Sequence, residues 1–180
     1  DMTVREFLHI SEFITDYDNL IRIAKEIKPS QFVCGVSMPD TINDITMGKL
    51  MELQSISNDA DFLILPCKII LGVSEETILN EDVQAVLSFS FWVSKEVERV
   101  NKLFSKASVT PTPEEQQAGI ENLKFGMFGL LDYYATRMHI PDHGDVEKIP
   151  WIRVYKCLDM DTRRMKFERR LRNIITKKKK

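Results

Sequence analysis

The stretch HIPDHGD, residues 139–145, holds the side chains of this sequence that are best suited to binding a metal. Two histidines and two aspartates lie within seven positions, and imidazole and carboxylate groups are ligands of Zn²⁺. Pro141 and Gly144 interrupt any helix there, however, so no pair of ligands one helical turn apart can form. We therefore predict no metal site, but an exposed polar turn in which Asp142 or Asp145 caps the following helix.

The three cysteines and the glycine pair of FGMFG could also take part in chemistry. Cys34, Cys67 and Cys157 are far apart and have apolar neighbours, which is typical of buried, reduced thiols in a cytosolic protein. Gly126 and Gly129 do not form a phosphate-binding loop, because no strand precedes them and no Gly-Lys-Ser/Thr follows. The sequence thus predicts no catalytic residues, no cofactor and no enzymatic activity. The rival hypothesis that stays open is an enzyme with His139, His143 and the nearby carboxylates as its site.

The elements that carry these residues are predicted to be helical. The chain has 180 residues, 43% hydrophobic and 29% charged, with only seven glycines and seven prolines. This composition favours an all-α fold. The apolar stretches 62–73 and 85–93 are too short or too interrupted to cross a bilayer, so we expect no membrane contact.

The charge is distributed unevenly along the chain. Residues 161–180 contain ten of the 25 Lys and Arg but only two of the 27 Asp and Glu, which leaves a net charge of −10 on residues 1–160. The C-terminal end is therefore suited to an anionic partner, or to the acidic part of a second copy of the chain.

The first half contains an approximate repeat. Residues 3–27 and 46–70 share seven identical positions of 25 at an offset of 43, together with an apolar face at helical spacing. We predict two helical hairpins, residues 3–44 and 46–82, which arose by duplication or as two unrelated hairpins of a common kind.

Each predicted hairpin has the same start and stop signals. Thr3 and Thr46 are placed to cap a first helix, and an Asp-x-Asp pair (positions 16 and 18, then 59 and 61) suits the start of a second. Gly35 and Gly72 are expected to end that second helix, and the serine two positions later, Ser37 or Ser74, to cap a short helix that follows.

A long helix over residues 80–107 is predicted to complete a scaffold domain, residues 2–108. SVTPTPEEQQ then breaks the chain, and Thr112, Pro113 and Glu115 match a capping box. The helix that starts there is expected to run to about Met138 and to use its two glycines for a close helix crossing. It opens a second helical region, residues 112–180.

From Pro150 onward the pattern indicates a short helix, a turn near residues 159–162 and a basic amphipathic helix. Phe167, Leu171, Ile174 and Ile175 form an apolar stripe with basic side chains around it. Three interpretations remain open: packing on the acidic body, docking on a protein partner, or binding nucleic acid. The predicted partner-binding residues are Trp151, Arg153, Tyr155, Arg163, Arg164, Lys166, Arg169, Arg170 and Arg172.

The order of these parts resembles a known group of phage proteins. The carrying segments are DITMGKLMELQSI, the helix ending in VERVNKLF, LKFGMFGLLDYYATRM and the closing VEKIPWIRVYKCLDMDTRRMKFERRLRNII. They are similar to small helical accessory proteins from the structural gene blocks of tailed bacteriophages, particularly those that infect Bacteroidetes. The similarity is closest to tail-assembly chaperones and related virion assembly proteins, and it covers most of the chain as an ordered pattern.

This resemblance implies a non-enzymatic role in phage assembly or in the virion. The expected partners are tape-measure, tail, neck or portal proteins, with self-association as a further expectation. The expected location is the host cytoplasm during assembly, or the virion. The alternative from the residues themselves is a nucleic-acid-binding module that uses the basic C-terminal helix.

Overall fold

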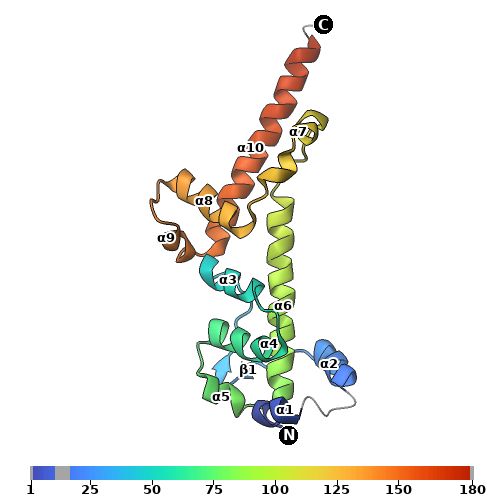
Figure 1. Ribbon diagram of the computed structural model, residues 1–180, viewed down its shortest axis with the longest axis vertical. Helices are drawn as coiled ribbons and strands as arrows, with labels where there is room; N and C mark the ends of the chain where they lie inside the picture. The colour runs from blue at the N-terminus through green and yellow to red at the C-terminus, as the bar shows by residue number, and fades with distance from the viewer. Residues whose placement is uncertain (1, 11–16, 179–180) are drawn as a thin grey trace. The chain divides into compact units, whose positions relative to one another are not determined.

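The computed structural model describes residues 2–10 and 17–178, without the side chains of residues 17–20. The chain is mostly helical (71%), with ten α-helices and one two-stranded hairpin in the described part. The helices are α1 (Val4–Ile10), α2 (Tyr17–Glu26), α3 (Met47–Gln54), α4 (Asp59–Pro66), α5 (Glu75–Leu79), α6 (Val83–Lys106), α7 (Pro113–Gln117), α8 (Gly126–Met138), α9 (His143–Glu147) and α10 (Trp151–Lys178). A π-helical segment, η2 (Cys67–Leu71), a 3₁₀ helix, η3 (Ile120–Leu123), and the strands β1 (Phe32–Val33) and β2 (Val36–Ser37) complete the fold (Figure 1).

The chain divides into two compact units. Unit 1 comprises residues 1–45 and 49–99, and unit 2 comprises residues 46–48 and 100–180, so the long helix α6 contributes to both. Unit 1 has eight Lys or Arg against seventeen Asp or Glu, and unit 2 has seventeen against ten. Their net charges are therefore −9 and +7, so the uneven charge of the sequence corresponds to a difference between two folded bodies.

Unit 1 is built around the first half of α6. Phe89, Val86 and Val93 of α6 are buried in one core with residues from α1, α4, η2 and α5. The chain around α1 pairs with the segment before α6, where the Val4 amide donates to the Glu81 carbonyl at 3.0 Å. Thr3 caps α1 as predicted: its Oγ1 accepts the Glu6 amide, and the Glu6 carboxylate accepts the Thr3 amide.

The structure does not show the predicted repeat. The two Gly-Val-Ser segments, which were expected to be equivalent, differ in structure. Gly72 ends η2 in the left-handed conformation (φ 67°), and Ser74 caps α5, as predicted. Gly35, in contrast, lies in the turn between β1 and β2 (φ 72°), and Ser37 lies in β2, so the expectation of a helix end and a helix cap there was wrong. The segment before Gly35 pairs back on itself instead of continuing a helix.

Of the two predicted Asp-x-Asp helix starts, the structure describes the second in full. Asp59 and Asp61 lie in the first turn of α4 as expected, with Asn58 as the cap that accepts the Asp61 amide. Asp16 lies outside the described residues. Pro66 ends α4, and because proline has no amide hydrogen, the regular α-helical bond to the Phe62 carbonyl cannot form. The chain continues from there as the π-helical η2.

In unit 2, the helix that was predicted from residue 112 to about residue 138 is interrupted. Its capping box is present, but α7 ends at Gln117 and the chain passes through η3 before α8 begins. Gly119 (φ 83°) and Gly126 (φ 57°) adopt the left-handed conformation, which breaks a right-handed helix. The expected close helix crossing is absent at Gly126, where a Cβ atom would meet nothing within 4 Å. Gly126 is therefore needed for its backbone conformation.

Helix α10 is continuous, so the predicted turn at residues 159–162 was wrong. No glycine or proline occurs between Trp151 and Lys178, and Arg163 forms an ion pair with Asp159 one turn earlier at 2.9 Å. One uninterrupted helix therefore carries all nine predicted partner-binding residues.

Candidate partner-binding surface

The first turns of α10 are anchored in the core of unit 2. Trp151 is fully buried, and its ring lies 6.0 Å from that of Phe104 on α6, while Tyr155 meets Phe104 edge to face at 5.7 Å. The chain before α10 is held by a bond from the Met47 amide to the Ile149 carbonyl at 2.8 Å. Burial and backbone pairing therefore fix where α10 begins.

A polar network holds the middle of α10 against α8. Asp161 accepts a hydrogen bond from Tyr133 at 2.5 Å and a charged one from Arg137 Nε at 2.8 Å. These two donors, Arg137 first, hold the pKa of the Asp161 carboxyl below its usual range. Burial, together with the Asp161 carboxylate, raises the pKa of Tyr133. The network therefore contains a carboxylate and a neutral phenol near neutral pH.

A second polar contact ties α10 to α7. Arg169 donates to the Thr110 carbonyl at 3.0 Å and to Glu115 at 2.6 Å. Glu115 is also the carboxylate that accepts the Thr112 amide in the α7 capping box. Arg169 thus neutralises a structural carboxylate of its own chain.

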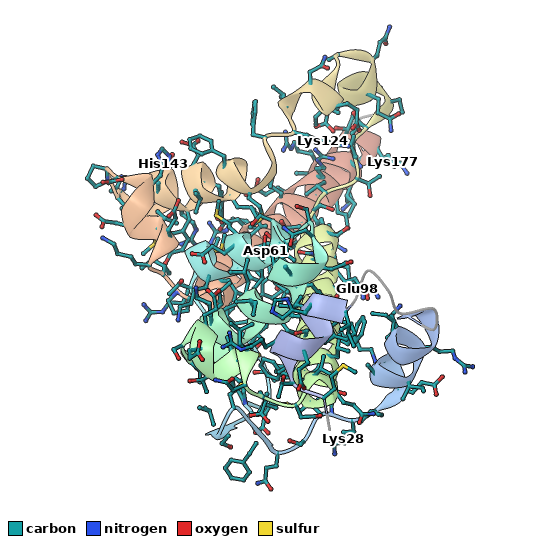
Figure 2. All side chains as sticks on the ribbon, turned by 60° about the horizontal axis from the view of Figure 1, so that its bottom comes forward. Lys28, Asp61, Glu98, Lys124, His143 and Lys177 are labelled. Carbon is teal, nitrogen blue, oxygen red and sulfur yellow. The ribbon has the colours of Figure 1, made fainter. Side chains whose placement is uncertain are left out.

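The opposite side of α10 carries an exposed apolar row. At about 100° per residue, its members fall within an arc of about 100° centred opposite Trp151 and Thr162. All are between 43% and 56% exposed. We call this row the α10 stripe: Met160, Phe167, Leu171, Ile174 and Ile175. Lys177 in Figure 2 marks the last turns of α10.

The nine residues predicted for partner binding separate into two groups. Trp151 is 0% exposed, Tyr155 is half-buried, and Arg169 binds its own chain, so these three position α10 and present little to a partner. The other six are exposed along α10: Arg153, Arg163, Arg164, Lys166, Arg170 and Arg172. Of the side chains that the structure describes, none forms an ion pair with Lys166, Arg170 or Arg172.

Met160 was not included in the predicted apolar stripe, because a turn was predicted at that point. The absence of glycine and proline after Pro150 was the signal for a continuous helix, which brings Met160 into line with Phe167 and Ile174 at intervals of seven.

A second exposed apolar patch was also missed. It consists of Leu123, Phe125 and Phe128, which are 59% to 65% exposed around the start of α8.

The HIPDHGD stretch forms the connection from α8 to α9. Asp142 caps α9 as predicted, with its Oδ1 accepting the Gly144 amide at 2.8 Å. His143 contacts Asp132 at 3.1 Å and lies against the ring of Phe128 (Figure 2). No group of three or more His, Cys, Asp or Glu side chains suited to a metal occurs within residues 2–10 and 17–178. In the same residues, no helix is long and apolar enough to cross a membrane.

Comparisons with known proteins find no relative of this chain. No protein-family model, no curated protein and no solved structure matches it.

Proposed function

We propose that this chain is a non-enzymatic binding protein of tailed-phage assembly, in the manner of a tail-assembly chaperone, and that α10 is its partner-binding element. The phage context rests on the resemblance of the sequence. The binding role is supported by the α10 stripe, an exposed apolar row on the side of a long helix opposite its own core contacts. The proposed site of action is the host cytoplasm during assembly, with retention in the virion as the other outcome.

The size of the stripe limits what it can do alone. Its five side chains are each about half exposed, so covering them would contribute on the order of 5 kcal/mol. Losing the free motion of two molecules costs about as much or more. A stable complex therefore needs further contacts next to the stripe, and the exposed basic side chains of α10 are placed to supply them.

These charges indicate the chemistry of the partner. Arg163 and Arg170 lie on the face next to the stripe, Arg164 lies within its arc, and Lys166 and Arg172 extend the positive surface. A matching surface would be an amphipathic helix with an apolar row and acidic flanks. We propose that such a helix belongs to a phage structural protein, in the first place the tape-measure protein, and otherwise a tail, neck or portal component.

The test uses the full chain and the products of the neighbouring genes. We expect one large structural protein to bind the wild-type chain in isothermal titration calorimetry, with an affinity that falls as salt rises. Ile174→Asp should weaken binding at least about tenfold, because it puts a charge into an apolar contact. Thr176→Asp is the matched control, since it adds the same charge in the same turn but away from the stripe. Equal effects of the two substitutions would refute the α10 stripe as the contact.

The exposed arginines also favour a second candidate, a nucleic-acid-binding module. Arg164, Lys166, Arg170 and Arg172 are exposed on one helix, and Phe167 between them could stack on a base. The expected sign is binding of a single-stranded or duplex oligonucleotide at about 50 mM salt with a steep salt dependence. Binding that is lost in Arg170→Glu but kept in Ile174→Asp would favour this function over the protein-binding one.

Self-association is the third outcome of the same experiments. A second copy offers an acidic unit 1, with a net charge of −9, to the basic α10 of the first. Sedimentation at several concentrations, with Ile174→Asp as the comparison, distinguishes a dimer through α10 from a monomer that awaits another protein.

A further inference from the structure

The turn between β1 and β2 contains a cysteine in a conformation that is unusual for it. Cys34 and Gly35 form a two-residue turn in which both φ angles are positive, 53° and 72°. Turns of this kind prefer Asn, Asp or Gly, because a side chain disfavours the left-handed region. His139 is the other non-glycine residue with positive φ in the described part of the chain, and it ends α8. Cys34 has no such role at a helix end.

Cys67 also lies at an irregular point of the backbone. It follows Pro66 as the first residue of η2, and π-helical turns are rare and are concentrated at functional sites. Cys67 is fully buried, Cys34 is 8% exposed, and both belong to the core of unit 1. The two thiol groups lie close enough for each to shift the pKa of the other. Two unusual stretches of backbone therefore meet at one pair of sulfur atoms.

We propose that Cys34 and Cys67 are a disulfide-forming pair, a site of reversible oxidation within unit 1. The bond would join the β1–β2 turn to the start of η2 across 33 positions of the chain. This inference is independent of the α10 surface and of any partner.

The co-reactant that the step requires is a low-molecular-weight disulfide. The Cys34 thiolate attacks one sulfur of that disulfide, its S–S bond breaks, and one small thiolate leaves. Cys67, after losing its proton to solvent, attacks the sulfur of Cys34 and releases the second small thiol. The two cysteines together lose two electrons and two protons, and the small disulfide is reduced to two thiols.

The surroundings assign the two roles. Cys34 is the more exposed thiol, and it lies in a hairpin with only two residues in each strand, which opens at small cost. The interaction with Cys67 lowers the pKa of Cys34, whereas the interaction with Cys34, burial and the nearby Glu81 raise the pKa of Cys67. Cys34 is therefore the attacking thiol and Cys67 the one that closes the bond.

The experiment oxidises the folded full chain with glutathione disulfide and then counts free thiols by alkylation under denaturing conditions and intact mass. The wild type and Cys157→Ser should each lose two alkylatable thiols and two hydrogen atoms of mass. A peptide pair joined through Cys34 and Cys67 should appear after digestion. Dithiothreitol should restore both thiols, and the oxidised form should unfold several degrees higher, because the bond restricts the unfolded chain.

Two variants keep the result interpretable. In Cys67→Ser the attacking thiol should stop at a mixed disulfide with glutathione, while Cys34→Gly, which suits the left-handed turn, should take up none on Cys67. Three results would overturn the proposal: no loss of thiols in the wild type, a bond that involves Cys157, or a disulfide between two chains on a non-reducing gel.

Discussion

The two faces of α10 make different contributions to stability, and a pair of truncations measures the difference. Val154 is 0% exposed on the side that packs within unit 2, whereas Leu171 is 43% exposed in the α10 stripe. Val154→Ala removes two buried carbon atoms and leaves a cavity, which should cost about 2 kcal/mol. Leu171→Ala removes atoms that already face solvent and should cost below about 0.5 kcal/mol.

The two tryptophans of the chain make this measurable for one unit at a time. Trp92 lies in unit 1 and Trp151 in unit 2, so in a Trp92→Phe background the fluorescence reports on unit 2. In urea titrations, Val154→Ala should lower the midpoint by about 1 M, at a slope of about 2 kcal/mol per M. Leu171→Ala should leave the midpoint almost unchanged, and a Trp151→Phe background should show little effect of either substitution on unit 1.

The comparison has a clear refuting result. If Leu171→Ala destabilises unit 2 as much as Val154→Ala, then the stripe is already buried in solution and α10 has no exposed apolar face. Repeating the titration at tenfold higher protein concentration separates two causes of that result. A midpoint that rises with concentration indicates a dimer through α10, and a constant midpoint indicates packing within the chain.

Four further predictions concern the supports of α10 and the end of η2. Tyr133→Phe should destabilise unit 2 by about 1 kcal/mol in the same fluorescence titration, because Asp161 loses a neutral donor. The Asp161 pKa is lowered in the folded state. The contribution of Asp161 to stability should therefore be complete above the unfolded pKa of about 3.9 and be lost as pH falls through the lower folded value. Wild type and Asp161→Asn should then converge in stability in acid, and a constant difference down to the lowest pH would contradict this. Thr112→Ala should cost about 1 kcal/mol by removing the α7 cap, and no loss in thermal unfolding would show that α7 adds nothing. Gly72→Ala should cost about 1 kcal/mol through backbone strain alone, because a Cβ there meets no atom within 4 Å, and a neutral result by circular dichroism would mean that the end of η2 readjusts.

Local signals in the sequence located several helix ends correctly. The α7 capping box and the caps of α1 and α5 each depend on residues within four positions of one another. The end of η2 depends on Gly72 alone, and the long α6 on apolar residues at helical spacing. The same kind of signal was misleading at Gly35, because a glycine with positive φ suits a hairpin turn as well as a helix end. Only pairing of the chain on either side distinguishes the two.

In the candidate surface, too, local properties could be predicted from the sequence and long-range contacts could not. The sequence indicated a basic helix with an apolar stripe, because composition and spacing are local properties. It could not tell which tryptophan, tyrosine or arginine faces inward. Trp151 is buried because Phe104 lies against it, and Arg169 is engaged because Glu115 needs a counter-charge.

The sequence by itself determined the helical composition, the uneven charge and the alternation of apolar and basic residues along the last helix, since these depend on residue type and spacing. The tertiary structure decided that this helix is continuous, that its buried and exposed faces are opposite each other, and that Cys34 lies next to Cys67. Contacts between residues far apart in the chain depend on how whole elements pack, and no short stretch of sequence contains that information.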